Sequence, residues 1–222
     1  MKSEVRDQRS GVSRRSFVQT LGLSAAAGAI SQRAEAAARA IERDAQQEGA
    51  ATEVAGPGAT EISLHVNGQE KKITIDPATT LLDALRMQLN LTGSKEICDR
   101  GSCGGCSVLI DGKLANSCMM LALDAVGSEI TTIEGLATDG ALDPVQESFI
   151  RHDALQCGYC TPGLVLAARA LLNEKPKPTM DEIKHGLSGN ICRCGTYTNI
   201  FNAVLEASGQ PVPVDGAEGG AA

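Results

Sequence analysis

The sequence predicts an α+β fold, in which a small sheet-containing domain over residues 61–137 precedes an all-helical domain over residues 140–208. Two short alternating runs near the start of the first domain are joined by Asn-Gly, and a later apolar run is followed by Asp-Gly; both pairs are typical of hairpin turns. From residue 143 onward, alternation gives way to helix-starting and helix-breaking residues. With 222 residues, of which 42% are hydrophobic, the chain has enough apolar material for buried cores.

The first domain is expected to begin with a β-hairpin. Residues 62–66 and 71–75 alternate between apolar and polar side chains, and Asn67-Gly68 lies between them. After the hairpin, Thr80 is expected to cap a helix over residues 81–89. One face of this helix would carry three leucines: Leu82, Leu85 and Leu89.

A loop rich in glycine and cysteine, residues 93–105, interrupts the first domain. Residues 106–110 then read as a strand, Asp111-Gly112 as a second hairpin turn, and residues 129–133 as a last strand.

The second domain is expected to contain four helices, over about residues 143–153, 163–173, 180–187 and 198–207. Thr161 and Pro162 fit the N-cap and first position of the second helix, and Thr179 fits the N-cap of the third. Pro176 and Pro178 separate these two helices.

The N-terminus predicts an export signal over residues 1–36. Arg14-Arg15 with Phe17 resembles the twin-arginine (Tat) signal, and an uncharged stretch and the small-residue site at 34–36 follow. The stretch is too short to span a membrane stably; an amphipathic helix is the alternative. Because the Tat route carries folded proteins, the signal indicates a periplasmic protein whose cofactor is inserted in the cytoplasm. Residues 37–60 are expected to be a linker and residues 209–222 a disordered tail.

Composition excludes several classes of function. A net charge of −7 argues against binding to nucleic acid, and an aromatic content of 2% argues against a base-stacking surface. With only three histidines, a zinc hydrolase or a histidine-based catalytic triad is disfavoured.

Eight cysteines dominate the chemistry and fall into two sets. The first set has the plant-type [2Fe–2S] spacing, and glycines between its members leave the loop free to aim N–H groups at sulfur. Its members are Cys98, Cys103, Cys106 and Cys118.

The second set lies at the ends of predicted helices and consists of Cys157, Cys160, Cys192 and Cys194. Four thiolates can hold a second cluster, but they also suit structural zinc. Four disulfides are a further alternative for an exported chain, although the Cys192-x-Cys194 pair would close a strained ring. Attached c-type haem is excluded, since Ser107 or Thr161, not histidine, follows each Cys-x-x-Cys.

Residues 61–208 resemble the iron–sulfur subunit of molybdenum hydroxylases, the xanthine dehydrogenase and aldehyde oxidase family. The matching stretches are CDRGSCGGCSVLIDG (98–112), TTIEGLA (131–137), QCGYCTPG (156–163) and SGNICRCG (188–195). The likeness is greatest to the exported, separate-chain subunit of periplasmic aldehyde oxidoreductases. Where many relatives have Cys-Thr-Gly-Tyr, this chain has Cys194-Gly-Thr-Tyr197, a departure that removes no thiolate.

The resemblance implies a β-grasp ferredoxin domain followed by a four-helix bundle, each with one [2Fe–2S] cluster. It implies that all eight cysteines are metal ligands, and that Gln156 and Cys194 lie near a molybdopterin on a large partner subunit. FAD would belong to a medium partner subunit, because this chain has no room for either cofactor's domain. No nucleic acid and no stable membrane span are expected.

The function implied is electron transfer in a periplasmic molybdenum hydroxylase that oxidises aldehydes or N-heterocycles, an aldehyde or xanthine dehydrogenase-like oxidoreductase. Substrate chemistry would take place on the partner, and no catalytic residue is expected in this chain. A free-standing exported ferredoxin is the first alternative, and a non-redox binding module with zinc or disulfides is the second.

Overall fold

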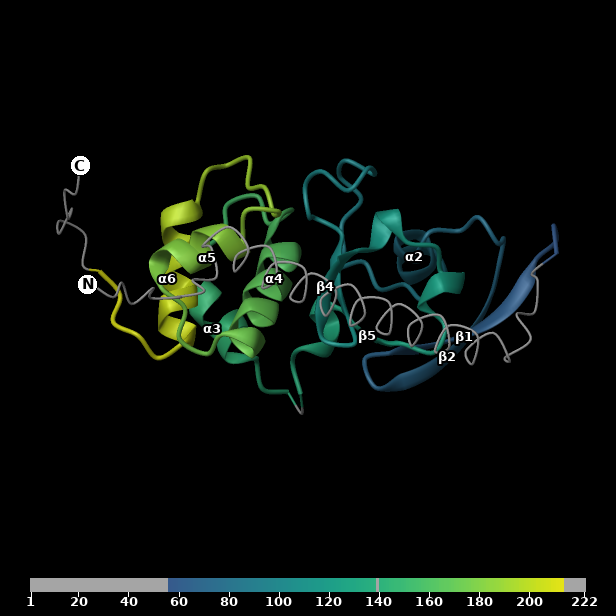
Figure 1. Cartoon of the computed structure of the whole chain (residues 1–222), viewed down its shortest axis with the longest axis horizontal. Coiled ribbons are helices and arrows are strands. Elements are labelled where there is room, and N and C mark those ends of the chain that lie inside the picture. Colours follow the sequence, from purple (N-terminus) through teal and green to yellow (C-terminus); the bar gives the residue numbers. More distant parts are fainter. Residues whose placement is uncertain (1–55, 139, 214–222) are drawn as a thin grey trace, which may run out of the picture. The chain divides into compact units, whose positions relative to one another are not determined.

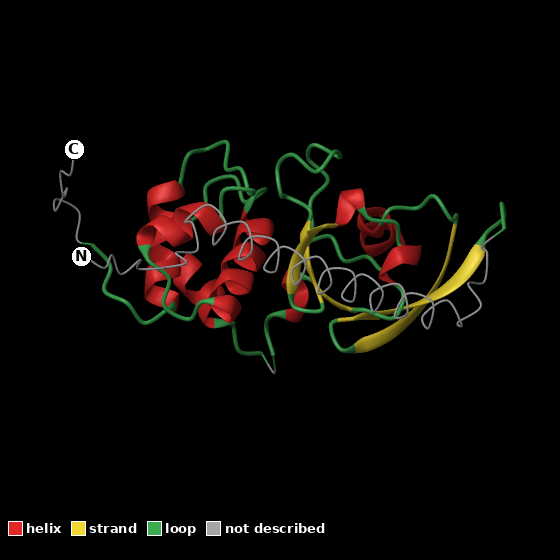
Figure 2. Ribbon diagram, viewed as in Figure 1, coloured by secondary structure: helices red, strands yellow, loops and turns green. Residues whose placement is uncertain are grey.

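The computed structural model of the chain describes residues 56–138 and 140–213. The predicted export signal, nearly all of the linker and the last residues of the predicted tail lie outside the described residues. The described part begins with a mixed β-sheet and short helical segments, and continues into longer α-helices (Figures 1 and 2). Among these residues, no helix is both long enough and apolar enough to cross a membrane.

A mixed sheet forms the first part, with strand order β2-β1-β5-β3-β4. Its strands are β1 (Thr60–Val66), β2 (Gln69–Ile75), β3 (Ser107–Ile110), β4 (Lys113–Asn116) and β5 (Glu129–Thr131). β1 runs parallel to β5, whereas the pairs β1–β2, β3–β4 and β3–β5 are antiparallel. Both predicted hairpin turns are present: Asn67 and Gly68 have φ of 53° and 72°, and Asp111 and Gly112 have φ of 49° and 77°.

The predicted helix after the first hairpin is present, but its winding differs from expectation. Thr80 caps α2 (Leu81–Asp83) by accepting a bond from the Asp83 N–H, and the chain then continues as the π-helix η1 (Ala84–Gln88). The prediction that Leu82 shares a face with Leu85 is wrong. Leu85 packs into the sheet core, whereas Leu82 packs against two cysteines of the first set.

Three short 3₁₀ segments complete the first part: η2 (Ser117–Met119), η3 (Leu123–Ala125) and η4 (Ile133–Gly135). The first of these carries Cys118 and thereby brings the fourth cysteine of the first set to the end of β4.

The second part consists of α3 (Pro144–Arg151), α4 (Thr161–Glu174), α5 (Met180–Gly186) and α6 (Tyr197–Ala207). α3 and α5 each begin with a capping box, Asp143 with Gln146 and Thr179 with Glu182. α4 begins one residue earlier than predicted. Cys160 is its N-cap and Thr161 its first residue, so the prediction of Thr161 as N-cap is wrong; its hydroxyl is buried without a hydrogen-bond partner among the described residues.

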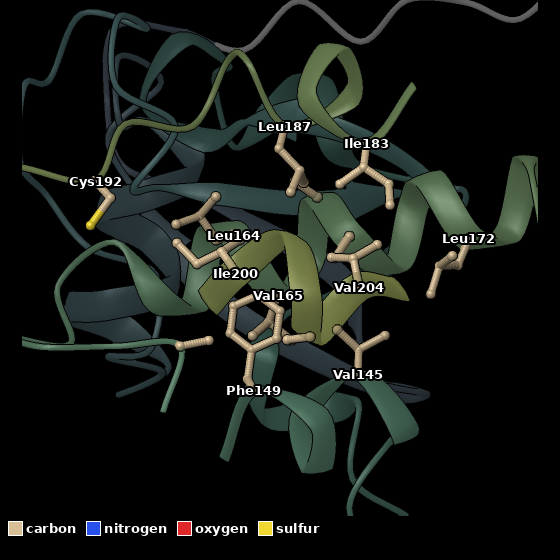
Figure 3. Packing of buried hydrophobic residues seen from close by; sticks show 14 of the residues in the cluster. Val145, Phe149, Leu164, Val165, Leu172, Ile183, Leu187, Cys192, Ile200 and Val204 are labelled. Carbon is tan, nitrogen blue, oxygen red and sulfur yellow. The ribbon is translucent and has the colours of Figure 1, made fainter. Parts of the chain in front are cut away.

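The helices enclose one apolar core, to which each of them contributes (Figure 3). Phe149 from α3, Leu164 from α4, Ile183 from α5 and Ile200 from α6 are all almost fully buried in it. Cys192 lies at the edge of this core, so the packing of the helices also fixes one cysteine of the second set (Figure 3).

The end of the described chain is packed more closely than the predicted tail implies. The Gln210 side chain donates a 2.8 Å hydrogen bond to the Pro178 carbonyl, and Val212 packs against the helical core. Residues 210 and 212, at the start of the predicted tail, therefore contact the helical part of the chain.

Replacement of Asp143 tests whether its side chain stabilises the start of α3. In Asp143→Ala the carboxylate no longer accepts the 2.8 Å bond from the Val145 N–H, and the free energy of unfolding should fall by about 1 kcal/mol. Asp143→Asn keeps an acceptor but loses the 3.5 Å ion pair with Arg169, so it should cost less than the alanine variant in urea unfolding. Equal losses would show that the ion pair, not the cap, carries the stability.

Candidate iron–sulfur centres

The first cysteine set is brought together by the loop between η1 and β3 and by η2. Cys106 Sγ lies 3.4 Å from Cys118 Sγ, and the thiol of Cys98 lies next to that of Cys103. The four thiols therefore meet as two pairs. Both pairs are close enough to influence each other, since the charge on Cys98 acts on Cys118.

The loop backbone turns its N–H groups toward these sulfurs. The Gly101 N–H donates to Cys118 Sγ at 3.3 Å, and the Gly105 N–H donates to Cys103 Sγ at 3.5 Å. Gly101 and Gly104 have φ of 67° and 69°, which glycine adopts without strain. Such N–H donors stabilise negative charge on sulfur, so the loop suits thiolates better than thiols.

The pairs contain thiols of contrasting acidity. Hydrogen bonds from the loop backbone, led by the Arg100 N–H, lower the pKa of Cys98 to about 7, whereas burial raises the pKa of its partner Cys103. Burial also raises the pKa of Cys118 to about 11. A bound metal would take the place of the thiol protons and hold both members of a pair as thiolates, because thiolate ligands must give up their protons on binding.

The second set is also arranged in two pairs. Cys157 lies next to Cys194, and Cys160 lies next to Cys192. The first of these pairs is exposed and the second is buried. Cys160 is the N-cap of α4, and Cys192 and Cys194 lie in the segment that leads into α6, so the starts of two helices hold the site together.

Two hydroxyl groups after the last cysteine support the buried pair. The Thr196 hydroxyl lies 3.3 Å from Cys192 Sγ, and the Tyr197 hydroxyl accepts a 2.9 Å bond from the Cys192 N–H. Burial opposes ionisation of Cys192, but hydrogen bonds from the side chain and backbone of Thr196 outweigh it and lower the pKa of Cys192 to about 7. Burial raises the pKa of Cys160 to about 12.

Sequence reasoning missed these supporting roles. The stretch Cys194-Gly-Thr-Tyr197 contains both hydroxyl residues, but their contacts with Cys192 form only in the folded loop. Gln156, predicted to face a partner's cofactor, is exposed and directly precedes the exposed Cys157.

Each donor set has the four thiols that a binuclear cluster requires. Within residues 56–138 and 140–213, no three histidine, cysteine, aspartate or glutamate side chains gather as one metal ion would require. Each cysteine set instead offers two pairs, and a [2Fe–2S] cluster has two irons that take two thiolates each.

Comparison with protein families gives two matches. Residues 64–129 match the 2Fe-2S iron-sulfur cluster binding domain, and residues 132–205 match the [2Fe-2S] binding domain. The two matched segments contain one cysteine set each.

Several curated proteins are similar over most of the described chain. The aldehyde oxidoreductase iron-sulfur-binding subunit PaoA of Escherichia coli is 45% identical over 169 residues, covering 69% of this chain and 74% of that protein. The nicotine 6-hydroxylase small subunit of Paenarthrobacter nicotinovorans is 48% identical over 150 residues, covering 68% of this chain and 90% of that protein.

Solved structures agree with these matches. A chain of quinoline 2-oxidoreductase from Pseudomonas putida matches with a TM-score of 0.66 and 43% identity, over 68% of this chain and 93% of that one. Aldehyde oxidoreductase from Desulfovibrio gigas matches with a TM-score of 0.64 and 37% identity, over 67% of this chain but 17% of that one.

The fold and the paired thiols define a two-domain iron–sulfur protein of the [2Fe–2S] class. The chain belongs to the family of iron–sulfur subunits of molybdenum hydroxylases, which includes aldehyde oxidoreductases and xanthine dehydrogenases. The expected resemblance is confirmed, and the chain is an electron-transfer subunit of an oxidoreductase.

Removal of the Thr196 hydroxyl should change the potential of one cluster. In Thr196→Val, Cys192 loses a donor that favours the more negative, reduced state. The potential of the cluster held by the second set should fall by roughly 20–60 mV, which is the value of one hydrogen bond of about 0.5–1.5 kcal/mol for a one-electron couple.

Thr196→Ser keeps the hydroxyl and is the matched control for this redox titration. Thr196 makes no side-chain cap bond to α6, so helix stability should change little in either variant. Equal potentials in the valine and serine variants would contradict a tuning role for the hydroxyl.

Proposed function

We propose that the chain carries electrons from a molybdopterin centre on a partner subunit, through a cluster on the second cysteine set and then one on the first, to FAD or an external acceptor. The oxidised substrate would be an aldehyde or an N-heterocycle, and the complex would be periplasmic. The observation that carries this proposal is the arrangement of each cysteine set as two thiol pairs, one of which, Cys157 with Cys194, is exposed. We class the two parts as a β-grasp ferredoxin domain and a four-helix bundle.

All eight cysteines are proposed as ligands, with each thiol pair on one iron. Cys98 and Cys103 would share one iron of the first cluster, and the 3.4 Å contact assigns Cys106 and Cys118 to the other. The second cluster would take Cys157 with Cys194 and Cys160 with Cys192. Each cluster, when bound, stores one electron at a time, while the chain's residues set its position, potential and access to solvent.

The exposure of the second set supports its place next to the partner. Gln156, Cys157 and Cys194 are exposed, and apolar side chains that would be covered by a partner are exposed beside them, namely Leu155 at 38%, Tyr159 at 59% and Ile191 at 50%. Apolar surface of this kind is typical of an interface. Cys106 and Cys118 of the first set are buried, so their iron is shielded.

The relatives support both substrate classes and a separate catalytic partner. PaoA is named as a subunit of an aldehyde oxidoreductase, whereas nicotine and quinoline, which appear in the names of other relatives, are N-heterocycles. This chain matches 17% of the Desulfovibrio gigas aldehyde oxidoreductase chain, which supports a substrate-oxidising site on a partner.

The order of the two clusters can be tested with one ligand variant in each set, in the assembled complex. Cys118→Ser should damage only the first cluster. Rapid mixing with substrate should then still reduce the second cluster, while steady turnover with the acceptor collapses. Cys194→Ser should damage the second cluster, and reduction of the first by substrate should become very slow.

Iron content has to be measured for both variants, because loss of a thiolate can unfold a domain. With the surviving cluster confirmed, the spectra decide the order. If Cys118→Ser blocked electron arrival at the second cluster, while Cys194→Ser left the first filling normally, the proposed order would be reversed.

The export route is tested in Arg14→Lys/Arg15→Lys, which preserves the charge but changes the feature read by the Tat exporter. The chain should then remain in the cytoplasm with its clusters intact, as measured by cell fractionation and iron content. A partner without a signal of its own should remain there too. Normal periplasmic activity of the double variant would refute the proposal.

A further inference from the structure

The loops that carry the two cysteine sets meet at Asn190, a buried side chain that is 4% exposed. Its Nδ2 donates to the Gly104 carbonyl at 2.8 Å and to the Ser107 hydroxyl oxygen at 3.1 Å. The Ser107 hydroxyl in turn donates to the same Gly104 carbonyl at 2.7 Å. A buried amide with these partners fixes the separation of the two segments, because leaving any of the groups unpaired would be costly.

A backbone bond runs beside this contact. The N–H of Ile191 donates to the Cys103 carbonyl at 2.9 Å. Ile191 directly precedes Cys192, and Cys103 directly precedes Gly104. Thus consecutive residues of one loop bind consecutive carbonyls of the other, and each loop contributes a cysteine next to the contact.

The contact between the two cysteine loops is tightly packed at Gly163 and Gly104. A Cβ on Gly163, in the first turn of α4, would collide with the Gly104 carbonyl oxygen and lie 3.1 Å from Asn190 Nδ2. A Cβ on Gly104 would lie 2.5 Å from Asn190 Nδ2 and 2.7 Å from the Gly189 carbonyl oxygen. Gly163 follows Cys160 by three residues, so this close approach sets how near the start of α4 comes to the first cysteine loop.

We propose that Asn190, Gly104 and Gly163 form a positioning junction that fixes the distance between the two clusters and thereby the rate of electron transfer between them. The inference rests on the proposed function, in that both cysteine sets must hold clusters. Its physical basis is that tunnelling falls exponentially with distance, so a small displacement of one loop changes the rate strongly while both clusters keep their ligands.

The test uses the full chain in its complex, with Gly163→Ala and Asn190→Ala as variants. Gly189→Ala is the matched control, because it adds the same methyl group one residue from Asn190 where no atom lies within 4 Å. In the fully reduced protein both clusters are paramagnetic, and their magnetic dipolar coupling reports their separation. The coupling should fall in both test variants, and the inter-cluster electron-transfer step should slow a few-fold, because both the coupling and the rate decrease with the distance between the clusters.

Iron content and the two reduction potentials should stay close to those of the unchanged chain in all three variants. Unchanged coupling in Gly163→Ala and Asn190→Ala, with both clusters intact, would overturn the junction while leaving the proposed function standing. Absence of a second cluster from the unchanged chain would instead overturn the proposed function.

A measurement on the unchanged protein covers the case in which neither variant folds. The Ile191 amide, held by the Cys103 carbonyl, should exchange with deuterium much more slowly than the amide of the exposed Arg193. Exchange of both amides at equal rates would mean that the loops separate freely, and would overturn the junction.

Discussion

The contact of 3.4 Å between Cys106 Sγ and Cys118 Sγ joins positions twelve residues apart, and neighbouring thiol pairs recur in both cysteine sets. Thiolates repel one another, so they tolerate such closeness only when a proton or a metal lies between them. The raised pKa values of Cys118, about 11, and Cys160, about 12, mean that these thiols keep their protons near neutral pH in the metal-free chain. Cluster insertion must displace those protons, and in return it ties four separate points of the backbone together. Metal loading and folding are therefore linked in each domain.

Much of the fold around these contacts could be predicted from local chemistry. Asn67-Gly68 predicted the first hairpin because its turn requires positive φ at both residues, and Thr179 predicted the start of α5 because a threonine hydroxyl can cap a helix. The apolar periodicity did not predict the orientation of side chains where tertiary packing determines it. Leu82 turns to the cysteines instead of sharing a face with Leu85, and the π-helical winding of η1 has no signature in the apolar pattern.

The cysteine spacing similarly identified which residues belong to each set, but it could not give the pairing within a set. Cys157 pairs with Cys194 across thirty-seven positions because the starts of α4 and α6 converge, which is a property of the packed helices. The roles of three polar side chains could not be predicted for the same reason, namely the hydroxyls of Thr196 and Tyr197 and the amide of Asn190. Each is an ordinary polar residue in the sequence, and its role depends on a contact with Cys192 or with the other cysteine loop.

The central claim, that each thiol pair holds one iron of a [2Fe–2S] cluster, is tested most directly by the metal content of the native chain. Iron, zinc and acid-labile sulfide should be measured on protein purified from cells, together with electron paramagnetic resonance spectra after reduction. The account predicts about four iron and about four sulfide per chain, with two distinguishable signals, since one site lies in a glycine-rich loop and the other at helix starts. A preparation that saturated at about two iron and one zinc per chain would contradict it, because the second set would then be a mononuclear zinc site.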